Sequence, residues 1–140
     1  MQMDKVKKFS AGQEFATEFL ITHNEMEVWK ALSGDFNPVH TDSKFAQDVG
    51  FKNILVYGGI LTAKITGIFA MDLPGYGYFE HSISTEFKSP VYIGDKLNAV
   101  MKVVYSNDDL GLLRLACSVT RGEVLICVTK MQAGRLPIPT

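Results

Sequence analysis

The feature that most constrains the fold is a long apolar helix pattern followed directly by strand patterns. Between Gly58 and Leu73, apolar residues recur at helical spacing, and the segment holds only one lysine and one aspartate. A helix with so few charges must be covered over most of its surface. After Pro74 the pattern changes to period two with many β-branched residues. The sequence therefore predicts one buried helix lying on a sheet.

Five strands are predicted, one near the N-terminus and four after the apolar helix. Turn signals at Asn107-Asp108-Asp109 and at Arg121-Gly122 separate the later strands, and the second signal predicts a tight hairpin. A mostly antiparallel sheet twisted around a single buried helix is the hot-dog arrangement, an α+β fold. The strands are predicted at about Phe15–Ile21, Tyr78–Phe87, Lys96–Ser106, Leu112–Arg121 and Glu123–Ala133.

The segment between the first strand and the apolar helix is predicted to be helical and rich in loops. Thr22 and Glu25 form a capping-box pattern that begins a helix, and Gly34 can adopt the left-handed conformation that ends one. Either Thr41 or Asp42 is expected to cap a further short helix. The chain of 140 residues fits one domain, residues 1–140. An unpaired edge strand needs a cover, so a homodimer with a continuous sheet is expected.

Composition excludes several classes of partner and cofactor. The formal net charge is -1 and no basic cluster is interleaved with aromatic residues, which argues against nucleic acid. No apolar run reaches membrane-spanning length, and the N-terminal residues lack a signal-peptide pattern, so a cytoplasmic protein is expected. Three histidines and the absence of a CxxC motif give no metal-ligand pattern. Cys117 and Cys127 are expected to be reduced core residues rather than a disulfide.

The loop SGDFNPVHTD, residues 33–42, carries the two side chains best suited to moving protons near neutral pH. Pro38 fixes its own φ, and Asp35 and Asn37 can each bond local backbone groups, so the loop is expected to be rigid. Held this way, Asp35 and His40 could share one water molecule. The local alternative is that Asp35 and Asn37 only form turns and that His40 flanks a helix.

The start of the apolar helix offers a second functional feature. The first amides of a helix have no partner within the helix and carry partial positive charge. Glycine allows a substrate to approach the backbone closely, so the Gly58 amide could stabilise a developing oxyanion. The alternative is that Gly58 and Gly59 only make a tight turn into the helix.

Together these segments resemble one family. Residues 32–40 (LSGDFNPVH) with Phe45-Ala46 are similar to the hydratase-2 signature of the MaoC-like (R)-specific enoyl-CoA hydratases. Tyr57-Gly58-Gly59 and residues 87–95 (FKSPVYIGD) also look like segments of that family. The resemblance covers roughly Thr22 to Lys130. It implies a hot-dog fold and, typically, a dimer.

The resemblance implies a hydro-lyase that reversibly adds water to a trans-2-enoyl-CoA and gives an (R)-3-hydroxyacyl-CoA. Asp35 and His40 would be the catalytic dyad, and Asn37 would support their loop. The Gly58 amide would bind the thioester carbonyl. Thr66 stands where the family often has a serine that supports the dyad, although its hydroxyl could instead bond its own helix. Coenzyme A belongs to the substrate, and no cofactor is implied.

This chain departs from the family at two positions near the helix start. The family usually has histidine where this chain has Tyr57, and commonly a larger residue, often methionine, in place of Gly59. Neither change removes the backbone amide of Gly58. Both could alter the support of the loop at residues 33–42 and the shape of the pocket that would hold the acyl chain. Lys64, inside the apolar helix, is expected to reach the surface rather than a phosphate of coenzyme A.

Three other functions share this fold. A (3R)-hydroxyacyl-acyl-carrier-protein dehydratase would use the same dyad in the reverse direction, with a protein carrier in place of coenzyme A. A hot-dog thioesterase would need an acid on the central helix, and Asp72 stands at its wrong end. A non-catalytic acyl-thioester-binding subunit would be expected to lack one member of the dyad, whereas this chain has both Asp35 and His40.

Overall fold

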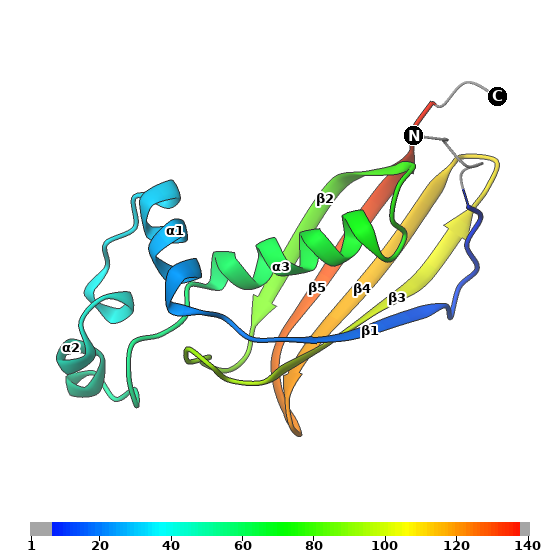
Figure 1. Ribbon diagram of the computed structural model, residues 1–140. Coiled ribbons are helices and arrows are strands. Elements are labelled where there is room, and N and C mark those ends of the chain that lie inside the picture. Colours follow the sequence, from blue (N-terminus) through cyan, green and yellow to red (C-terminus); the bar gives the residue numbers. More distant parts are fainter. Residues whose placement is uncertain (1–6, 138–140) are drawn as a thin grey trace.

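A computed structural model describes residues 7–137 and shows one antiparallel sheet wrapped around one helix (Figure 1). The strand order in the sheet is β1-β3-β4-β5-β2. The strands are β1 (Glu14–Phe19), β2 (Tyr78–Phe87), β3 (Leu97–Asn107), β4 (Leu112–Arg121) and β5 (Val124–Arg135). The helices are α1 (His23–Ser33), the 3-10 helix η1 (Pro38–His40), α2 (Ser43–Asp48) and α3 (Gly58–Met71). This is the α+β hot-dog arrangement that the sequence predicts.

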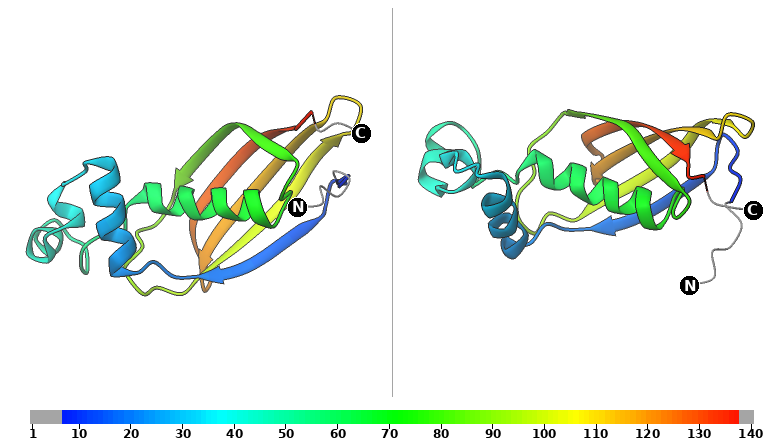
Figure 2. Two further views of the ribbon diagram at one scale, coloured as in Figure 1. Left: turned by 45° about the horizontal axis from the view of Figure 1, so that its top comes forward. Right: turned by 90° about the horizontal axis from the view of Figure 1, so that it is seen from above.

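Helix α3 lies along the concave face of the sheet, and the core forms between them (Figure 2). The strands supply alternate residues to this face, as expected for a sheet with one side turned to the core. Burial of these side chains is the main source of stability for the fold. The buried side chains of α3 are Ile60, Leu61, Ile65, Ile68 and Phe69. The largest fully buried side chains of the strands include Leu97, Met101, Val103, Leu113, Leu115 and Ile126.

Strands β1 and β2 form the two edges of the sheet. Strand β2 pairs with β5 along one side, and within residues 7–137 no strand pairs with its other side. A bulge between Glu80 and Ser82 shifts the register near the start of β2. On either side of the bulge, Glu80 pairs with Ala133 and Ile83 pairs with Met131, so both point to the helix-facing side of the sheet.

Residues 22–56 form a lobe, here named the α1–α2 lobe, which extends past the end of the sheet where α3 begins (Figures 1 and 2). The predicted capping box at its start is present, with the Thr22 hydroxyl and the Glu25 carboxylate each bonding the other residue's amide. Gly34 ends α1 in the left-handed conformation, with φ of 70°. Of the two predicted caps for α2, Asp42 is the one used.

Strands β2 and β4 have the predicted ends, whereas the ends of β1, β3 and β5 differ from prediction by one or two residues. β1 ends at Phe19, and Ile21, which continues the apolar pattern, is fully buried outside the strand. Cys117 and Cys127 are free and buried, as predicted, and burial raises their pKa values to about 12 and about 11. Within residues 7–137, no helix has both the length and the apolar character needed to cross a membrane.

Candidate active site

The loop between α1 and α2 is held by its own side chains. Asp35 Oδ1 accepts a hydrogen bond from the Asn37 amide at 2.9 Å, and Asn37 Oδ1 accepts one from the Val39 amide at 3.1 Å. Each bond closes a local turn in which a side chain replaces a backbone acceptor. Pro38 then begins η1 with its fixed φ. These bonds explain how so short and polar a segment becomes a defined loop, as the sequence predicts.

His40 is partly buried, and one nitrogen of its ring is bound to the backbone. Nδ1 lies 2.8 Å from the carbonyl oxygen of Leu55. Because a carbonyl oxygen can only accept, Nδ1 carries a hydrogen and Nε2 of the neutral ring keeps its lone pair. Nε2 is therefore free to accept a proton, and to donate one after it has been protonated.

Tyr57 contacts both members of the predicted dyad. Its phenol donates a hydrogen bond to the backbone carbonyl of Asp35 over 2.6 Å, and its ring stacks on the His40 ring with centroids 4.2 Å apart. Burial raises the pKa of Tyr57, and the negative charge of the nearby Asp35 raises it further. The phenol therefore stays protonated near neutral pH and remains a donor. Tyr57 thus holds the loop against the start of α3.

The first amides of α3 are available to a ligand. The Tyr57 side chain does not cap the helix, and within residues 7–137 no acceptor binds the Gly58 amide. Tyr57, whose ring stacks on His40, directly precedes Gly58 in the chain. A free helix N-terminal amide stabilises negative charge that develops on an oxygen. The geometry is compatible with the predicted oxyanion role of Gly58.

Two aromatic rings account for the pair of glycines at this position. A Cβ added to Gly58 would lie 2.8 Å from the Phe87 ring, and a Cβ added to Gly59 would lie 2.0 Å from the Trp29 ring. Trp29 of α1 therefore fills the space that a larger residue at position 59 would need. The departure from the family pattern at Gly59 is thus matched by a side chain from the α1–α2 lobe.

Lys64 forms an ion pair with Glu25 and so connects α3 to the first turn of α1. Burial alone would raise the pKa of Glu25, but hydrogen bonds from Lys64 and Thr22 outweigh it and lower the pKa. Lys64 is about one-third exposed, so its stem lies along the helix surface while its ammonium group bonds the lobe. The sequence predicted the exposure of Lys64 but not its partner.

Thr66 lies about two turns along α3 from Gly58, beside Glu80 of β2. Burial raises the pKa of the Glu80 carboxyl, and the Thr66 hydroxyl partly offsets this rise. Glu80 Oε1 is buried and has no hydrogen-bond partner among residues 7–137. In the same part of the chain no hydrogen bond joins Thr66 to Asp35 or to His40. The supporting role of Thr66 toward the dyad therefore stays a prediction.

The contacts link Asp35 and Asn37 within their loop, and Tyr57, which precedes Gly58, contacts both the Asp35 carbonyl and the His40 ring. The joint role of these residues stays a prediction. In the described chain the Asp35 and His40 side chains are not directly hydrogen-bonded, which leaves both free to bind a third group. The residues that sequence reasoning did not assign to the site are Tyr57, Trp29, Phe87 and Glu80. Tyr57 and Gly59 were visible as departures from the family pattern, but their contacts were not.

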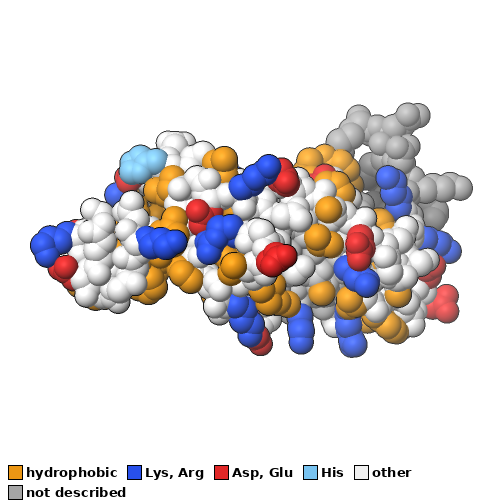
Figure 3. All heavy atoms as spheres, turned by 90° about the horizontal axis from the view of Figure 1, so that it is seen from below, with side chains coloured by type: hydrophobic (Ala, Val, Ile, Leu, Met, Phe, Trp, Pro, Cys, Tyr) orange, Lys and Arg blue, Asp and Glu red, His pale blue; other side chains and the backbone are white. Residues whose placement is uncertain are grey.

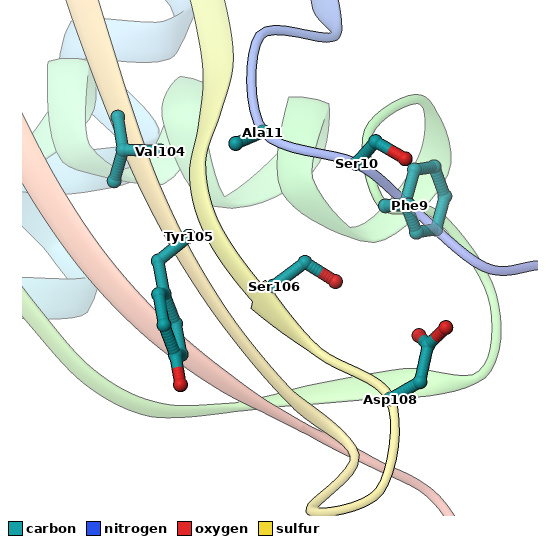
Figure 4. Close-up of a pocket in the computed structure, with 7 residues that line it drawn as sticks. All are labelled: Phe9, Ser10, Ala11, Val104, Tyr105, Ser106 and Asp108. Carbon is teal, nitrogen blue, oxygen red and sulfur yellow. The ribbon is translucent and has the colours of Figure 1, made fainter.

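Two surface hollows lie away from this site. One, of about 400 Å³, lies between the N-terminal segment and the end of β3 and contains none of the predicted site residues (Figure 4). Another, of about 320 Å³, lies on the outer face of the sheet around Arg114 and Lys130.

Figure 3 shows one face of the molecule, on which cationic and anionic side chains are interspersed. Within residues 7–137, no three His, Cys, Asp or Glu side chains gather as a metal site.

Comparison with known proteins places most of the chain in the family that the sequence resembles. The family model described as MaoC like domain matches residues 6–111. An (R)-specific enoyl-CoA hydratase from Aeromonas caviae is 32% identical over 113 residues, which are 81% of this chain and 84% of that protein. A mitochondrial 3-hydroxyacyl-[acyl-carrier-protein] dehydratase from Arabidopsis thaliana is 31% identical over 85 residues, which are 61% of this chain and 50% of that protein.

The same relationship is visible in three dimensions. A solved structure described as the (R)-hydratase from A. caviae involved in PHA biosynthesis superimposes with a TM-score of 0.85 at 29% identity. The match covers 91% of this chain and 98% of that one. The hot-dog fold predicted from the sequence is thereby confirmed.

Proposed function

This chain belongs to the MaoC-like domain family and is a hydro-lyase, and on that premise we propose that it adds water to trans-2-enoyl-CoA thioesters. The product is the (R)-3-hydroxyacyl-CoA, and the reaction is reversible. The observation that supports this proposal is the bonded loop that carries Asp35 and His40, together with Tyr57, which precedes Gly58 and contacts both the Asp35 carbonyl and the His40 ring.

The proposed chemistry uses each group at a stated atom. The Asp35 oxygen that does not bind Asn37 and the free Nε2 of His40 bind one water between them. As the water oxygen bonds Cβ, its O–H bond breaks and the proton passes to the dyad. The π electrons of the double bond move onto the thioester carbonyl oxygen, where the Gly58 amide stabilises them. The dyad then returns one proton to Cα, so atoms and charge balance.

Asp35 and His40 act as a coupled pair in this scheme, and the division of acid and base roles between them stays open. Asn37 supports the loop through its bond to the Val39 amide. Water and the thioester supply all reacting atoms, so no metal, nucleotide or redox cofactor is part of the proposal. The predicted homodimer and cytoplasmic location are also part of the proposal, and the unpaired edge of β2 is the surface at which a second copy would join the sheet.

The second candidate is dehydration of a (3R)-hydroxyacyl chain on an acyl carrier protein. It is favoured by the similarity to the A. thaliana dehydratase, whose name states that carrier. The dyad and the oxyanion donor would be unchanged, because hydration and dehydration share one transition state. Rates with crotonyl-CoA and with crotonyl-acyl-carrier-protein would separate the two candidates.

The test is hydration of crotonyl-CoA, followed by loss of the conjugated-enoyl absorbance and by chiral analysis of the product. We expect the wild type to be active and the variants Asp35→Asn and His40→Gln each to lose a factor of about 10² to 10⁴ in kcat. Asp48→Asn is a matched control, because Asp48 is an exposed lobe carboxylate that pairs with Lys44. Equal rates in wild type and both dyad variants would sink the dyad assignment.

A non-catalytic acyl-thioester-binding subunit is the contrasting class. It would bind crotonyl-CoA without converting it, and longer enoyl chains or carrier-bound chains would not restore turnover. Thr66→Ala tests the remaining predicted residue: a loss in kcat without a change in the free energy of unfolding would support its role toward the dyad.

A further inference from the structure

The N-terminal end of α3 lies between two aromatic rings from different parts of the fold. A Cβ added to Gly58 would meet the Phe87 ring of β2, and a Cβ added to Gly59 would meet the Trp29 ring of α1. Successive helix residues point in directions about 100° apart, so the two rings stand on different sides of the helix. Each Cα–Cβ bond of a helix is tilted toward its N-terminus. Both rings therefore lie toward the end at which the first amides of α3 point.

The first two amides of α3 are free between these rings. Neither the Gly58 nor the Gly59 amide has a hydrogen-bond acceptor among residues 7–137. An oxygen that accepts from these amides is held at the end of the helix, where the partial positive charge is greatest. The rings then limit the space for the groups that are bonded to the atom carrying this oxygen.

Of the two rings, Trp29 is the one on the side of the proposed dyad. Glu27 and Lys30, which flank Trp29 on α1, lie close enough to Tyr57 for their charges to act on the pKa of its phenol. Tyr57 in turn contacts both residues of the proposed dyad. The α1 helix therefore borders the dyad, whereas Phe87 belongs to the sheet.

We propose that the Trp29 indole forms the wall of the site that contacts Cα of the enoyl thioester, and that it restricts the substrates to acyl groups without a branch at Cα. The inference rests on the proposed hydration, in which the thioester carbonyl accepts from the Gly58 amide. The carbonyl carbon is bonded to sulfur on one side and to Cα on the other. Hydration requires the Cα–Cβ bond to face the dyad, so Cα lies on the side of Trp29 and sulfur on the side of Phe87.

Gly59 is the residue that allows the indole to reach this position. A Cβ at position 59 would lie 2.0 Å from the ring, so a side chain there and the indole compete for one volume. The lobe thus supplies a wall that a larger residue on α3 would supply instead. A methyl group on Cα of the substrate would enter the volume that the indole already fills. A side chain at position 59 should therefore be able to replace the indole as the wall.

The experiment compares kcat/KM for crotonyl-CoA and trans-2-methylcrotonyl-CoA in wild type, in Trp29→Ala and in Trp29→Ala combined with Gly59→Met. The branched thioester is intrinsically less reactive, but this difference is the same for all three proteins and cancels. One methyl group in a fitted pocket is worth about 10- to 200-fold in kcat/KM. We expect the ratio of branched to plain substrate to rise at least about tenfold in Trp29→Ala and to return toward the wild-type ratio in the double variant.

Two further variants make the comparison specific. Val28→Ala shortens the residue next to Trp29 on the same helix, where the side chain is 58% exposed, and should leave the ratio unchanged. If Trp29→Ala does not fold, Trp29→Phe keeps an aromatic ring of smaller size. We then expect a smaller rise of the ratio in the same direction. A general defect in folding or catalysis lowers both rates and leaves their ratio unchanged.

A binding measurement tests the contact directly, because Trp29 is the only tryptophan of the chain. In His40→Gln, which is expected to turn over slowly, saturating crotonyl-CoA should reduce the quenching of the indole fluorescence by acrylamide. A Trp29 that only packed the lobe against α3 would be quenched equally with and without the thioester.

The outcomes separate this inference from the function on which it rests. If the wild type hydrates neither thioester, the proposed function fails and the inference fails with it. If the wild type hydrates crotonyl-CoA but the ratio is the same in the Trp29 variants, only the inference is overturned. Equal quenching in the presence and absence of the thioester would likewise overturn only the inference.

Discussion

The α1–α2 lobe and the sheet with α3 are held in shape by different kinds of interaction. In the sheet and α3, fully buried aliphatic side chains fill a continuous core. In the lobe, α1 and α2 bury one residue each, Met26 and Ala46, and η1 buries none. Leu32, just before the loop of residues 33–42, is 77% exposed, and Phe36, within that loop, is 66% exposed. Caps and local side-chain bonds give the lobe its shape instead.

This difference matters because the proposed chemistry lies at the junction of the two regions. The dyad belongs to the lobe, whereas the Gly58 amide belongs to α3. Their relative position depends on a few contacts across the junction: the packing of Trp29 on Gly59, the contacts of Tyr57 and the ion pair of Lys64. Breaking these contacts one at a time tests how much the position of the lobe depends on its contacts with α3.

The largest effect is expected from Gly59→Met, which introduces the residue often found in the family. Its Cβ would lie 2.0 Å from the Trp29 ring, so α1 must move away from α3. We expect a loss of about 2 kcal/mol in the free energy of unfolding and a loss in kcat of about tenfold or more. Urea denaturation and crotonyl-CoA hydration measure the two effects.

Two companion variants make the Gly59 experiment specific. Trp29→Ala combined with Gly59→Met should recover part of both losses, because the new side chain then has the space left by the indole. Gly67→Ala is the control on the same helix, since nothing lies within 4 Å of a Cβ at that position. It should raise stability by about 0.5 to 1 kcal/mol. Failure of the double variant to recover would show that Trp29 and Gly59 are not a matched pair.

The same contrast explains what could be predicted from the sequence. The strands and α3 follow from the period of apolar residues, and the lobe follows from local signals such as the Thr22 capping box and the Asp35 and Asn37 turns. Both kinds of signal act within a few residues of the chain. The hydrogen bond from Tyr57 to Asp35 spans 22 positions, and the contact of Gly59 with Trp29 spans α1 and α3. Such contacts depend on the assembled fold.

Glu80 illustrates the same limit at the sheet. A glutamate in a strand pattern at an edge is expected to point to solvent. The bulge between Glu80 and Ser82 shifts the alternation, so Glu80 lies on the core side while the following residues keep their register with β5. A bulge inserts one residue into a strand, and no strong sequence signal predicts where it occurs. The side of the sheet on which the Glu80 carboxylate lies depends on that bulge.

An intermediate effect is expected from Tyr57→Phe, which removes the bond to the Asp35 carbonyl and keeps the ring stacked on His40. Because Tyr57 positions the loop and does not touch the reacting atoms, kcat should fall about tenfold while KM changes little. The raised pKa of Tyr57 keeps the wild-type phenol protonated, so the ratio of wild-type to variant kcat should stay constant from about pH 6 to 9.

Tyr57→His is a second test at this position, because it introduces the residue usual in the family. We expect it to recover activity in part if an imidazole can reach the same carbonyl. A Tyr57→Phe enzyme with unchanged kcat would show that the phenol contributes only packing. The dyad loop would then be held by its local turns alone.

The smallest effect is expected from Lys64→Met, which keeps the aliphatic stem and removes the ion pair with Glu25. Both partners are about one-third exposed, and solvent screens the pair, so the loss in the free energy of unfolding should be below about 1 kcal/mol. The pKa of Glu25 is lowered in the folded state, so the stabilisation is present above the ordinary carboxyl pKa and lost as pH falls through the folded value.

The difference in stability between wild type and Lys64→Met should therefore be greatest near neutral pH and should vanish once the pH has fallen below the lowered pKa of Glu25 in the folded protein. Urea denaturation at several pH values measures it. Lys44→Met, which breaks an exposed pair inside the lobe, should show almost no difference at any pH. If the two lysine variants behave alike, the Lys64 pair contributes nothing beyond a surface pair. Trp29 and Tyr57 would then carry the attachment of the lobe to α3.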